Sequence, residues 1–511
     1  MTHPDSCDLL VVGGGTNGAG IARDAAGRGL SVALCEQGDF AGGTSSASTK
    51  LIHGGLRYLE YREFRLVAEA LSERGHLLRI AAHISRPMRF GLPHVKGLRP
   101  RWMIRLGLWL YDHIGGRISL PHSRAVALNA LGTPSGLRPA LVHAFEYSDA
   151  WVDDARLVIL NLRSAQAHGA RILARTRLAS AERRGGGWHC VLENMLTGEK
   201  RVLKARAVVN ATGPWVGRVD AFLNPRPKTA PGTLKLVRGS HIVTRRLFAG
   251  EHAYMLQNHD RRIVFMIPYE DDYTLIGTTD VEEPDIDKRA HVSPEEEQYL
   301  LDAANTYLAQ PIAASDIVWR YAGVRPLYGE EVENPSAVSR DYTLLVNDEA
   351  GAPCVSVYGG KITTYRRLAE SVMEALSPWF TTPRGAWTAT EALPGSGFPR
   401  EQRALELARL WQAHPRFDPR FLERLFSRHG LHARAILGDA RTPADLGRDW
   451  GGGLTQREVD YLVANEWARE PDDILWRRTK CGLHMSEAQR AAFAQAFTAA
   501  LVDSPREAAY A

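Results

Sequence analysis

The sequence has little cysteine, little net charge and no long apolar run. Its five cysteines are widely spaced over 511 residues and form no C-x-x-C pair, which argues against a disulfide framework and against a zinc site. The net charge of +5 is too small for this length to indicate a nucleic-acid binder. No Lys or Arg precedes the short apolar run that ends at Gly13, so we expect no secretory signal and a reducing, cytoplasmic location.

Several catalytic signatures are missing as well. The chain contains no G-x-S-x-G elbow, no H-E-x-x-H helix and no Walker-type G-K-[ST] loop, so we predict neither these hydrolytic chemistries nor a metal site. The neighbouring acids Asp153 and Asp154 would point apart on a helix or a strand. We therefore interpret them as a helix cap rather than as a paired catalytic site.

The composition is that of a folded protein with more than one domain. Hydrophobic residues make up 44% and charged residues 24% of the chain, and its length exceeds what a single core usually supports. We predict an α/β region over residues 1–390, with later strands at 207–210, 263–267, 273–276, 342–346 and 354–357, several of which form an antiparallel sheet. A Pro- and Gly-rich stretch around 393–399 marks the boundary with an all-α region, which we place at 391–511. Its predicted helices cover 401–413, 421–429, 456–467, 471–480 and 486–501.

A glycine motif opens the first predicted helix. Residues 8–12 form a buried strand, Gly13, Gly15 and Gly18 form G-x-G-x-x-G, residues 17–28 form a helix, and residues 31–35 form a second strand that leads to Glu36. The glycines allow a tight turn and the close approach of a pyrophosphate, and the helix N-terminus attracts its charge. Glu36 would accept hydrogen bonds from a ribose and disfavours a 2′-phosphate, so the unit predicts a dinucleotide other than NADP.

Seven motifs in order extend this pattern along the chain. They lie at residues 44–60, 145–149, 151–156, 210–215, 239–241, 276–280 and 323–326. With these motifs, residues 8–367 closely resemble the FAD-dependent glycerol-3-phosphate dehydrogenases, within the superfamily of D-amino-acid-oxidase-like and glutathione-reductase-type FAD proteins. The likeness continues less sharply into the helical region.

The resemblance implies a fold, a cofactor and a reaction. The expected fold is a Rossmann-type FAD-binding domain interleaved with an antiparallel-sheet substrate domain, followed by the all-α domain. The reaction is the oxidation of sn-glycerol 3-phosphate to dihydroxyacetone phosphate, with electrons passed to membrane quinone by a peripheral, homodimeric enzyme on the inner face of the membrane. The expected FAD-binding residues are Gly13, Gly14, Gly15, Asn17, Gly18, Glu36, Thr44, Ser45, Ser46, Lys50, Leu51, His53, Gly54, Thr212, Gly213, Gly360, Lys361, Ile362, Thr363 and Thr364.

The substrate and catalytic residues are expected within the same motifs. A phosphate dianion needs fixed cations, and Arg offers a planar, permanently charged fork, which makes Arg57 and Arg325 the candidates, with Lys361 as a third cation. Tyr58 could anchor the substrate through its hydroxyl. Oxidation of an alcohol also needs a base, and His53, His241 and Arg325 form the expected catalytic set. The resemblance puts His241 at the substrate and His53 near the flavin, and leaves the base undetermined.

Two basic segments have more than one interpretation. Residues 86–124 contain eight basic residues and one acid among several Trp and Leu residues, and are too charged to cross a bilayer. These residues are typical either of a core helix with a solvated basic rim or of a segment that lies in the interface of an anionic membrane. The family resemblance favours the membrane interpretation. The cluster Trp476–Lys480 is interpreted as a solvated face.

Three other functions compete with the quinone-linked dehydrogenase. The first is a soluble glycerol-3-phosphate oxidase that reoxidises its flavin with oxygen. The second is a flavin-bearing binding protein without turnover. The third is an amino-acid oxidase, which would need a clamp for a carboxylate rather than several cations for a phosphate.

Overall fold

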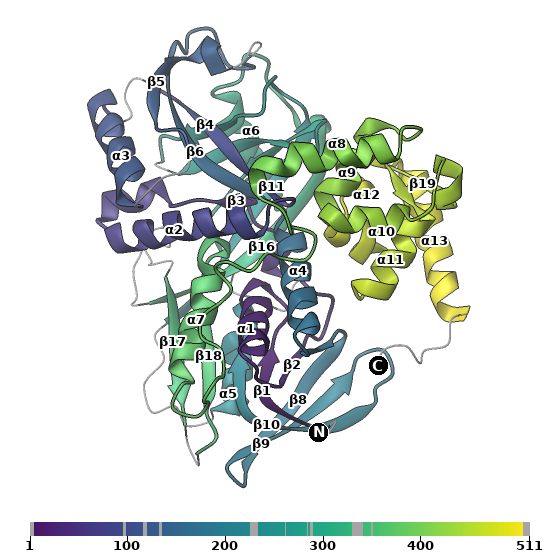
Figure 1. The fold of residues 1–511 in the computed structure, drawn as a ribbon. Helices are drawn as coiled ribbons and strands as arrows, with labels where there is room; N and C mark the ends of the chain where they lie inside the picture. The colour runs from purple at the N-terminus through teal and green to yellow at the C-terminus, as the bar shows by residue number, and fades with distance from the viewer. Residues whose placement is uncertain are drawn as a thin grey trace.

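The fold has two sheet-containing parts and a helical part beside them. The computed structural model describes residues 5–95, 99–115, 120–131, 135–224, 233–260, 262–283, 285–286, 290–329, 341–348 and 351–503. In Figure 1 a mainly parallel sheet lies at the bottom, an antiparallel sheet at the top, and the helices of the last hundred residues at the right. Among the described residues, no helix is long and apolar enough to span a membrane.

The first sheet has the strand order β17-β18-β10-β1-β2-β7, parallel except for β17. Its central strands are buried on both sides, which explains their unbroken apolar runs. The helices α1, α4 and α7 share a core with one face of the sheet, and α5 with the hairpin β8–β9 covers the other face. The bounds are β1 Ser6–Val12, α1 Thr16–Gly27, β2 Val32–Cys35, α4 Asp154–Ala167, β7 Arg171–Leu173, β8 Thr176–Arg184, β9 Gly187–Asn194, β10 Lys200–Asn210, α5 Val216–Leu223, β17 Tyr342–Asn347, β18 Cys354–Gly359 and α7 Tyr365–Ala375.

The second sheet is mostly antiparallel, with the order β15-β11-β14-β13-β12-β4-β6-β3, β16 on β11 and β5 on β6. The helices α2 and α3 pack on one of its faces and α6 on the other. Of the later strands that we predicted, 263–267 and 273–276 are confirmed as β13 and β14, which pair antiparallel in this sheet. The bounds are β3 Leu51–Ile52, α2 Phe64–Ile80, β4 Ser85–Pro93, α3 Arg101–Ile114, β5 Arg124–Ala127, β6 His143–Val152, β11 Thr233–Arg245, β12 Ala253–Gln257, β13 Ile263–Tyr269, β14 Tyr273–Gly277, β15 Val281–Glu282, α6 Pro294–Asn305 and β16 Ile317–Gly329.

The C-terminal part is helical apart from one short ribbon, β19–β20. The segment predicted as a helix over 471–480 instead forms a π-helical turn, η12, at Asp473–Arg478. We propose that the boundary between the two domains lies at residue 390, within the irregular chain that joins α7 to α8. The bounds are α8 Arg403–Ala413, α9 Pro419–His429, α10 Ala433–Leu437, β19 Asp449–Gly451, β20 Leu454–Thr455, α11 Gln456–Asn465, α12 Cys481–His484 and α13 Glu487–Asp503.

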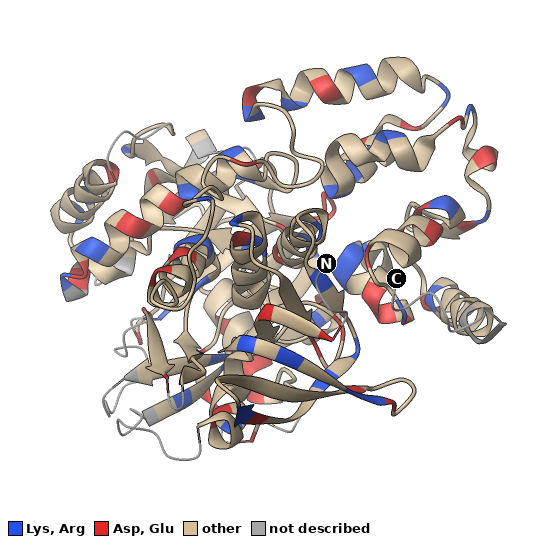
Figure 2. Ribbon diagram, turned by 60° about the horizontal axis from the view of Figure 1, so that its bottom comes forward, with Lys and Arg blue, Asp and Glu red and all other residues tan. Residues whose placement is uncertain are grey.

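The basic stretch 86–124 is not one interfacial segment. It divides into β4, α3 and β5, and only α3 has a broad exposed apolar face. Four of its eight basic residues pair with three acids from elsewhere in the chain; the pairs are Arg86–Glu251, Arg89–Glu146, Arg99–Glu60 and Arg124–Glu146. Lys96 and Arg117 lie outside the described residues. Over the molecule as a whole, Figure 2 shows basic and acidic residues interspersed along the helices and strands.

The prediction of a solvated face for Trp476–Lys480 is wrong. Arg478 is completely buried, and Thr479 and Lys480 are buried beside it. The ring of Trp476 stacks on Trp319 of β16, with centroids 4.8 Å apart. The basic side chains are buried because they meet carboxylates of the first domain, which sequence-local reasoning does not reveal.

Candidate active site

The glycine turn between β1 and α1 packs against the end of β10. Gly13 has φ +111°, and a Cβ there would lie 2.5 Å from the carbonyl oxygen of Ala211. A Cβ on Gly18 would lie 1.9 Å from the carbonyl oxygen of Gly13. Side chains are therefore excluded at both positions, and the N-terminus of α1 faces the cavity beside the turn, as a dinucleotide phosphate requires.

Glu36 lies at the end of β2 and faces the same turn. Its Oε2 accepts the N–H of Gly14 at 2.8 Å, and its Oε1 accepts the N–H of Gly38 at 2.9 Å. Burial raises the pKa of Glu36, and these two hydrogen bonds oppose the rise. The carboxylate is thus held in a fixed orientation on the wall of the cavity.

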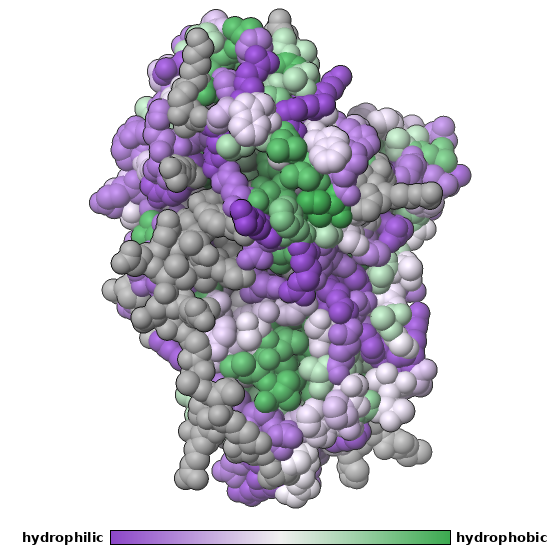
Figure 3. All heavy atoms as spheres, turned by 90° about the vertical axis from the view of Figure 1, so that its left-hand side faces the viewer, coloured by the Kyte–Doolittle hydropathy of each residue, from purple (hydrophilic) through white to green (hydrophobic). Residues whose placement is uncertain are grey.

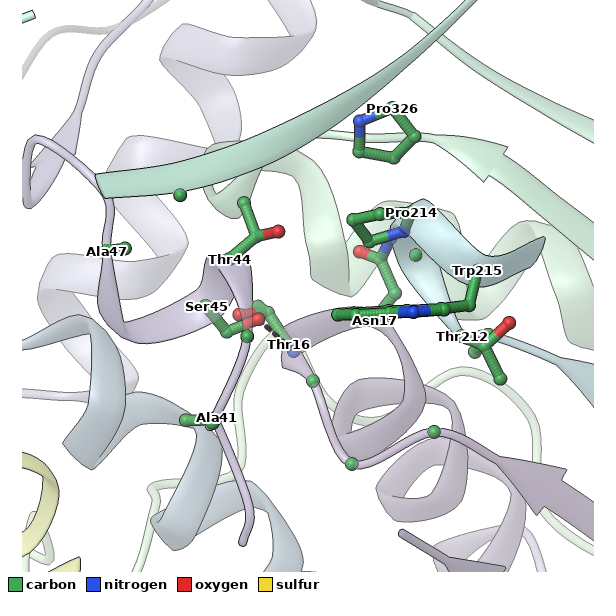
Figure 4. A pocket seen from close by; sticks show the side chains of 18 of the residues that line it. Thr16, Asn17, Ala41, Thr44, Ser45, Ala47, Thr212, Pro214, Trp215 and Pro326 are labelled. Atoms are coloured by element: carbon green, nitrogen blue, oxygen red, sulfur yellow. Dashed lines mark hydrogen bonds between the residues drawn. The ribbon is translucent and has the colours of Figure 1, made fainter. Parts of the chain in front are cut away.

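A cavity of about 940 Å³ extends from this turn to the antiparallel sheet. In Figure 4, Thr44 and Ser45 come from one wall of the pocket, and Thr212, Pro214 and Trp215 come from the opposite wall. The expected cofactor residues that line it are Gly13, Gly14, Gly15, Asn17, Glu36, Thr44, Ser45, Leu51, His53, Thr212, Gly213, Gly360, Lys361, Ile362 and Thr363. Within the described residues, Gly18, Ser46, Lys50, Gly54 and Thr364 are not part of the lining.

Lys50 anchors the loop that precedes β3. Its ammonium group lies 3.0 Å from both carboxylate oxygens of Asp154 and donates to the carbonyl of Ser46 at 3.1 Å. The side chain is 1% exposed and is not part of the cavity lining, and the expected contact of Lys50 with the cofactor stays a prediction. Asp153 caps α4 by accepting the N–H of Arg156, which confirms the helix-cap interpretation for that residue.

His241 lies on β11 at the far end of the cavity. Its Nε2 is 2.9 Å from the hydroxyl of Thr49, which also lines the cavity, and its ring stacks on Tyr321 with centroids 4.7 Å apart. Gly277 on the adjacent strand leaves room for the ring, because a Cβ there would lie 2.1 Å from it. Burial lowers the pKa of His241 well below its usual value, with Lys50 and Arg325 acting in the same direction, so the imidazole is neutral at pH 7.

Arg325 lies on β16, close to His241 in the paired strand. Its Nη2 donates to Asp280 Oδ1 at 2.6 Å and to the carbonyl of Thr279 at 2.9 Å. The hydroxyl of Thr279 donates to Glu296 of α6 at 2.6 Å, so that the segment which holds Arg325 is itself fixed. Asp280 belongs to a motif that the sequence singled out, but its role as the partner of Arg325 was missed.

The other expected substrate residues lie on two loops that meet at the cavity. Lys361 lies just before the turn η8 (Ile362–Thr364), and its Nζ is 4.0 Å from the centre of the Tyr58 ring. The N–H of His53 donates to the hydroxyl of Thr363 at 3.3 Å. Arg57 belongs to the turn η2 (Leu56–Tyr61), and its side chain lies outside the described part of the structure.

A residue that sequence reasoning did not find supports the loop of His53. Tyr111 of α3 accepts the N–H of Gly54 at 2.7 Å and donates to the carboxylate of Asp149, which pairs with Arg74. Tyr111 is 57 residues from Gly54. No local pattern could connect the two, because only the packing of α3 on the sheet brings them together.

The doubly wound sheet has a glycine turn at its first crossover, and one cavity joins this turn to His241 and Arg325 of the antiparallel sheet. This arrangement defines a dinucleotide-dependent oxidoreductase. Residues 8–366 match the model of the FAD dependent oxidoreductase family, and residues 386–502 match that of the C-terminal domain of alpha-glycerophosphate oxidase. The chain belongs to the FAD dependent oxidoreductase family and uses FAD as its cofactor.

Several characterised proteins are similar over almost their whole length. The aerobic glycerol-3-phosphate dehydrogenase of Escherichia coli K12 is 49% identical over 490 residues, which cover 96% of each chain. The D-erythritol 1-phosphate dehydrogenase of Brucella abortus is 47% identical over 500 residues, covering 97% of this chain and 99% of the relative. The crystal structure of the Bacillus halodurans glycerol-3-phosphate dehydrogenase with FAD has a TM-score of 0.75 and 27% identity, and the match covers 98% of this chain and 92% of that one.

Proposed function

We propose that this enzyme oxidises the C2 hydroxyl of sn-glycerol 3-phosphate to give dihydroxyacetone phosphate, and passes the electrons to a membrane quinone. The observation that carries the proposal is that a neutral His241 and the cation Arg325 line the same cavity as the dinucleotide turn. The relatives named above as glycerol-3-phosphate dehydrogenases support the choice of substrate.

The residues of the cavity fit FAD and a phosphorylated alcohol. The glycine turn, Glu36 and the loop of Thr44 and Ser45 would hold the dinucleotide at one end. At the other end, Arg325, Lys361 and Arg57 would bind the phosphate, while Tyr58 holds the substrate by its hydroxyl. When bound there, FAD would supply the redox chemistry, with its N5 as the hydride acceptor.

We assign the substrate proton to Nε2 of His241. A neutral imidazole is ready to accept a proton, and Nε2 faces Thr49 on the cavity wall, whereas Nδ1 is buried out of contact with solvent. A phosphate dianion bound to Arg325 would raise the low pKa of His241, because a nearby negative charge favours the imidazolium. His53, beside Thr363, is assigned to the flavin side of the cavity.

The proposed reaction can be tested on the purified holoenzyme without oxygen. Addition of sn-glycerol 3-phosphate is expected to bleach the flavin absorption near 450 nm, whereas glycerol is not, because it lacks the phosphate. D-erythritol 1-phosphate, named for one relative, is the competing substrate. Faster bleaching with that compound would reject the assignment of glycerol 3-phosphate, and no bleaching with either would reject the enzyme as a phosphate-alcohol dehydrogenase.

The electron acceptor needs its own measurement. With substrate present, a quinone analogue should sustain turnover and little peroxide should form in air. Rapid formation of peroxide, together with indifference to the quinone, would instead support the oxidase.

We also propose that α3 binds the enzyme peripherally to the cytoplasmic face of a membrane. Separately, we propose that the enzyme is a homodimer. The outer face of α3 carries four exposed apolar side chains: Trp102 (67% exposed), Met103 (43%), Leu106 (50%) and Trp109 (51%). On its inner face, Ile104, Leu108 and Tyr111 are buried. Figure 3, which views the side of the molecule on which α3 lies, shows apolar side chains in the upper half of this face. Such a helix suits insertion into the interface of a bilayer. The dimer can be tested by light scattering.

A further inference from the structure

A segment of the C-terminal helical part reaches the cofactor cavity. Glu470, Asp472 and Arg477, on or next to the π-helical turn η12, line the cavity together with residues of the first domain. They lie near Glu36, whose expected partner is the ribose of the adenosine half of the cofactor. The C-terminal part therefore contributes to a site that the fingerprint motif assigns to the first domain alone.

Asp39 is the main connection between this segment and the first domain. It follows Glu36 by three residues, and its carboxylate accepts two hydrogen bonds from Arg478, at 2.6 and 2.7 Å, and another from Nε of Arg477. Its side chain is 3% exposed, and that of Arg478 is completely buried. Burial would raise the pKa of Asp39, but Arg478 and Arg477 lower it below its usual value. In its buried position the carboxylate is therefore kept ionised by the two guanidinium groups of the C-terminal segment.

A second connection lies on the other side of Glu36. Arg175 pairs with buried Asp473 at 3.0 Å and with Glu470 at 2.9 Å. The next residue, Thr176, donates its N–H to the carbonyl of Glu36 at 2.7 Å. The two ion-pair clusters thus flank the strand end that carries Glu36, and displacement of η12 would disturb both sides of it.

The charges of the segment suit the adenosine half of a dinucleotide better than its phosphates. The carboxylates of Glu470 and Asp472 can accept hydrogen bonds from ribose hydroxyl and adenine amino groups, but would repel a pyrophosphate. The planar guanidinium of Arg477 can lie against an aromatic ring as well as pair with Asp39. The pyrophosphate has its own site at the N-terminus of α1.

We propose that residues 470–478 complete the adenosine-side wall of the FAD site, so that binding of FAD and docking of this segment stabilise each other. A ligand that contacts both parts binds the docked state more tightly, and by thermodynamic reciprocity it favours docking by the same factor. The loop of Asp39 would then be more mobile in the apoprotein than in the holoenzyme.

The test measures cofactor affinity rather than turnover, with full-length apoprotein and flavin fluorescence. Arg477→Ala is expected to raise the dissociation constant for FAD by about tenfold, within the usual range of coupling between sites. Its affinity for FMN, which lacks the adenosine half, should not change. Arg424→Ala is the matched control, because Arg424 also joins the C-terminal part to the first domain, through Asp271 and Asp272, but lies away from the cavity.

Two further measurements keep the proposal testable if Arg477→Ala does not fold. Asp472→Asn changes an exposed lining residue and should weaken FAD binding without weakening FMN binding. In the unaltered protein, FAD should protect the backbone amides of residues 468–480 from hydrogen exchange. Equal FAD affinities in the Arg477 and Arg424 variants, equal losses for FAD and FMN, or no protection by FAD would overturn the proposal.

Discussion

The hydroxyl of Tyr111 accepts the backbone N–H of Gly54 at 2.7 Å, which joins the helix with the exposed apolar face to the loop of the active site. The same hydroxyl donates to Asp149 at 2.7 Å, and Asp149 is paired with Arg74. Burial raises the pKa of Tyr111 well above its usual value, and Asp149 raises it further, so the hydroxyl keeps its proton and remains a donor. The position of His53, next to Gly54, thus depends on the packing of α3.

Removal of this hydroxyl should impair the reaction without loss of the cofactor. In Tyr111→Phe, the N–H of Gly54 and the carboxylate of Asp149 lose a buried partner, which costs about 1–3 kcal/mol. We expect kcat/KM for sn-glycerol 3-phosphate to fall by about tenfold, since 1.4 kcal/mol corresponds to that factor. Flavin content should stay unchanged.

The matched control for that variant is Tyr147→Phe. Tyr147 is a buried tyrosine in the same core whose hydroxyl contacts the sulfur of Met255 rather than the active-site loop. An equal loss of activity in the two variants would show that Tyr111 contributes to the core in general and not to the position of the loop.

Asp280→Asn should weaken substrate binding more than it slows the chemical step. Asp280 holds the guanidinium of Arg325 at 2.6 Å, and loss of its charge releases one of the contacts that fix Arg325 toward the cavity. We expect KM for the phosphate substrate to rise by about tenfold, because a charge-assisted hydrogen bond contributes about 1.5–3 kcal/mol. Glu297→Gln is the control, since Glu297 pairs with exposed Arg320 on the same strand. An unchanged KM in Asp280→Asn would remove Arg325 from the phosphate site.

The outer face of α3 should determine membrane binding. Replacement of both Trp102 and Trp109 by Glu is expected to reduce binding to anionic vesicles by about tenfold or more, because burial of a large apolar side chain contributes about 1.5–3 kcal/mol. Co-sedimentation with vesicles measures this. Trp411→Glu, at an exposed tryptophan of α8, is the control, and binding that survives the double substitution would place the membrane contact elsewhere.

The free energy of unfolding should fall as the pH decreases from 6.5 toward 4.5. Burial lowers the pKa of His252 to about 4, with Glu146 and Glu251 opposing, and burial also lowers the pKa of His83 and His429. The unfolded chain takes up these protons near pH 6.5 while the folded chain does not, so acid favours unfolding.

Each histidine that is protonated in the unfolded chain but not in the folded chain contributes at most about 1.4 kcal/mol per pH unit to the slope of the unfolding free energy against pH. His252→Phe keeps the ring contacts with Phe248 and Tyr254 but cannot titrate, and should reduce the slope measured by urea unfolding. The exposed His259→Asn variant serves as the control. An unaltered slope in His252→Phe would contradict the low pKa of His252.

Much of the architecture could be predicted from the residues alone. The βαβ unit at residues 6–35 and most helices of the C-terminal part follow from apolar periodicity and turn residues, which act over short distances along the chain. The resemblance of ordered motifs indicated FAD, and most of the expected cofactor residues line the cavity. The ion pair of Lys50 could not be predicted, because its position within a motif does not reveal that Asp154, 104 residues away, lies beside it.

The class of the protein could be read from local patterns, because glycines that must lie close to a phosphate and apolar strands that must be buried are recognisable in the sequence. The partners of the charged side chains, in contrast, follow from the folded structure. Four of the eight basic residues of the stretch 86–124 pair with distant acids, and Arg478 is buried against Asp39 instead of lying in solvent. An ion pair forms where the folded chain brings two oppositely charged side chains within a few ångströms of each other. The order of residues along the chain does not say which side chains come that close.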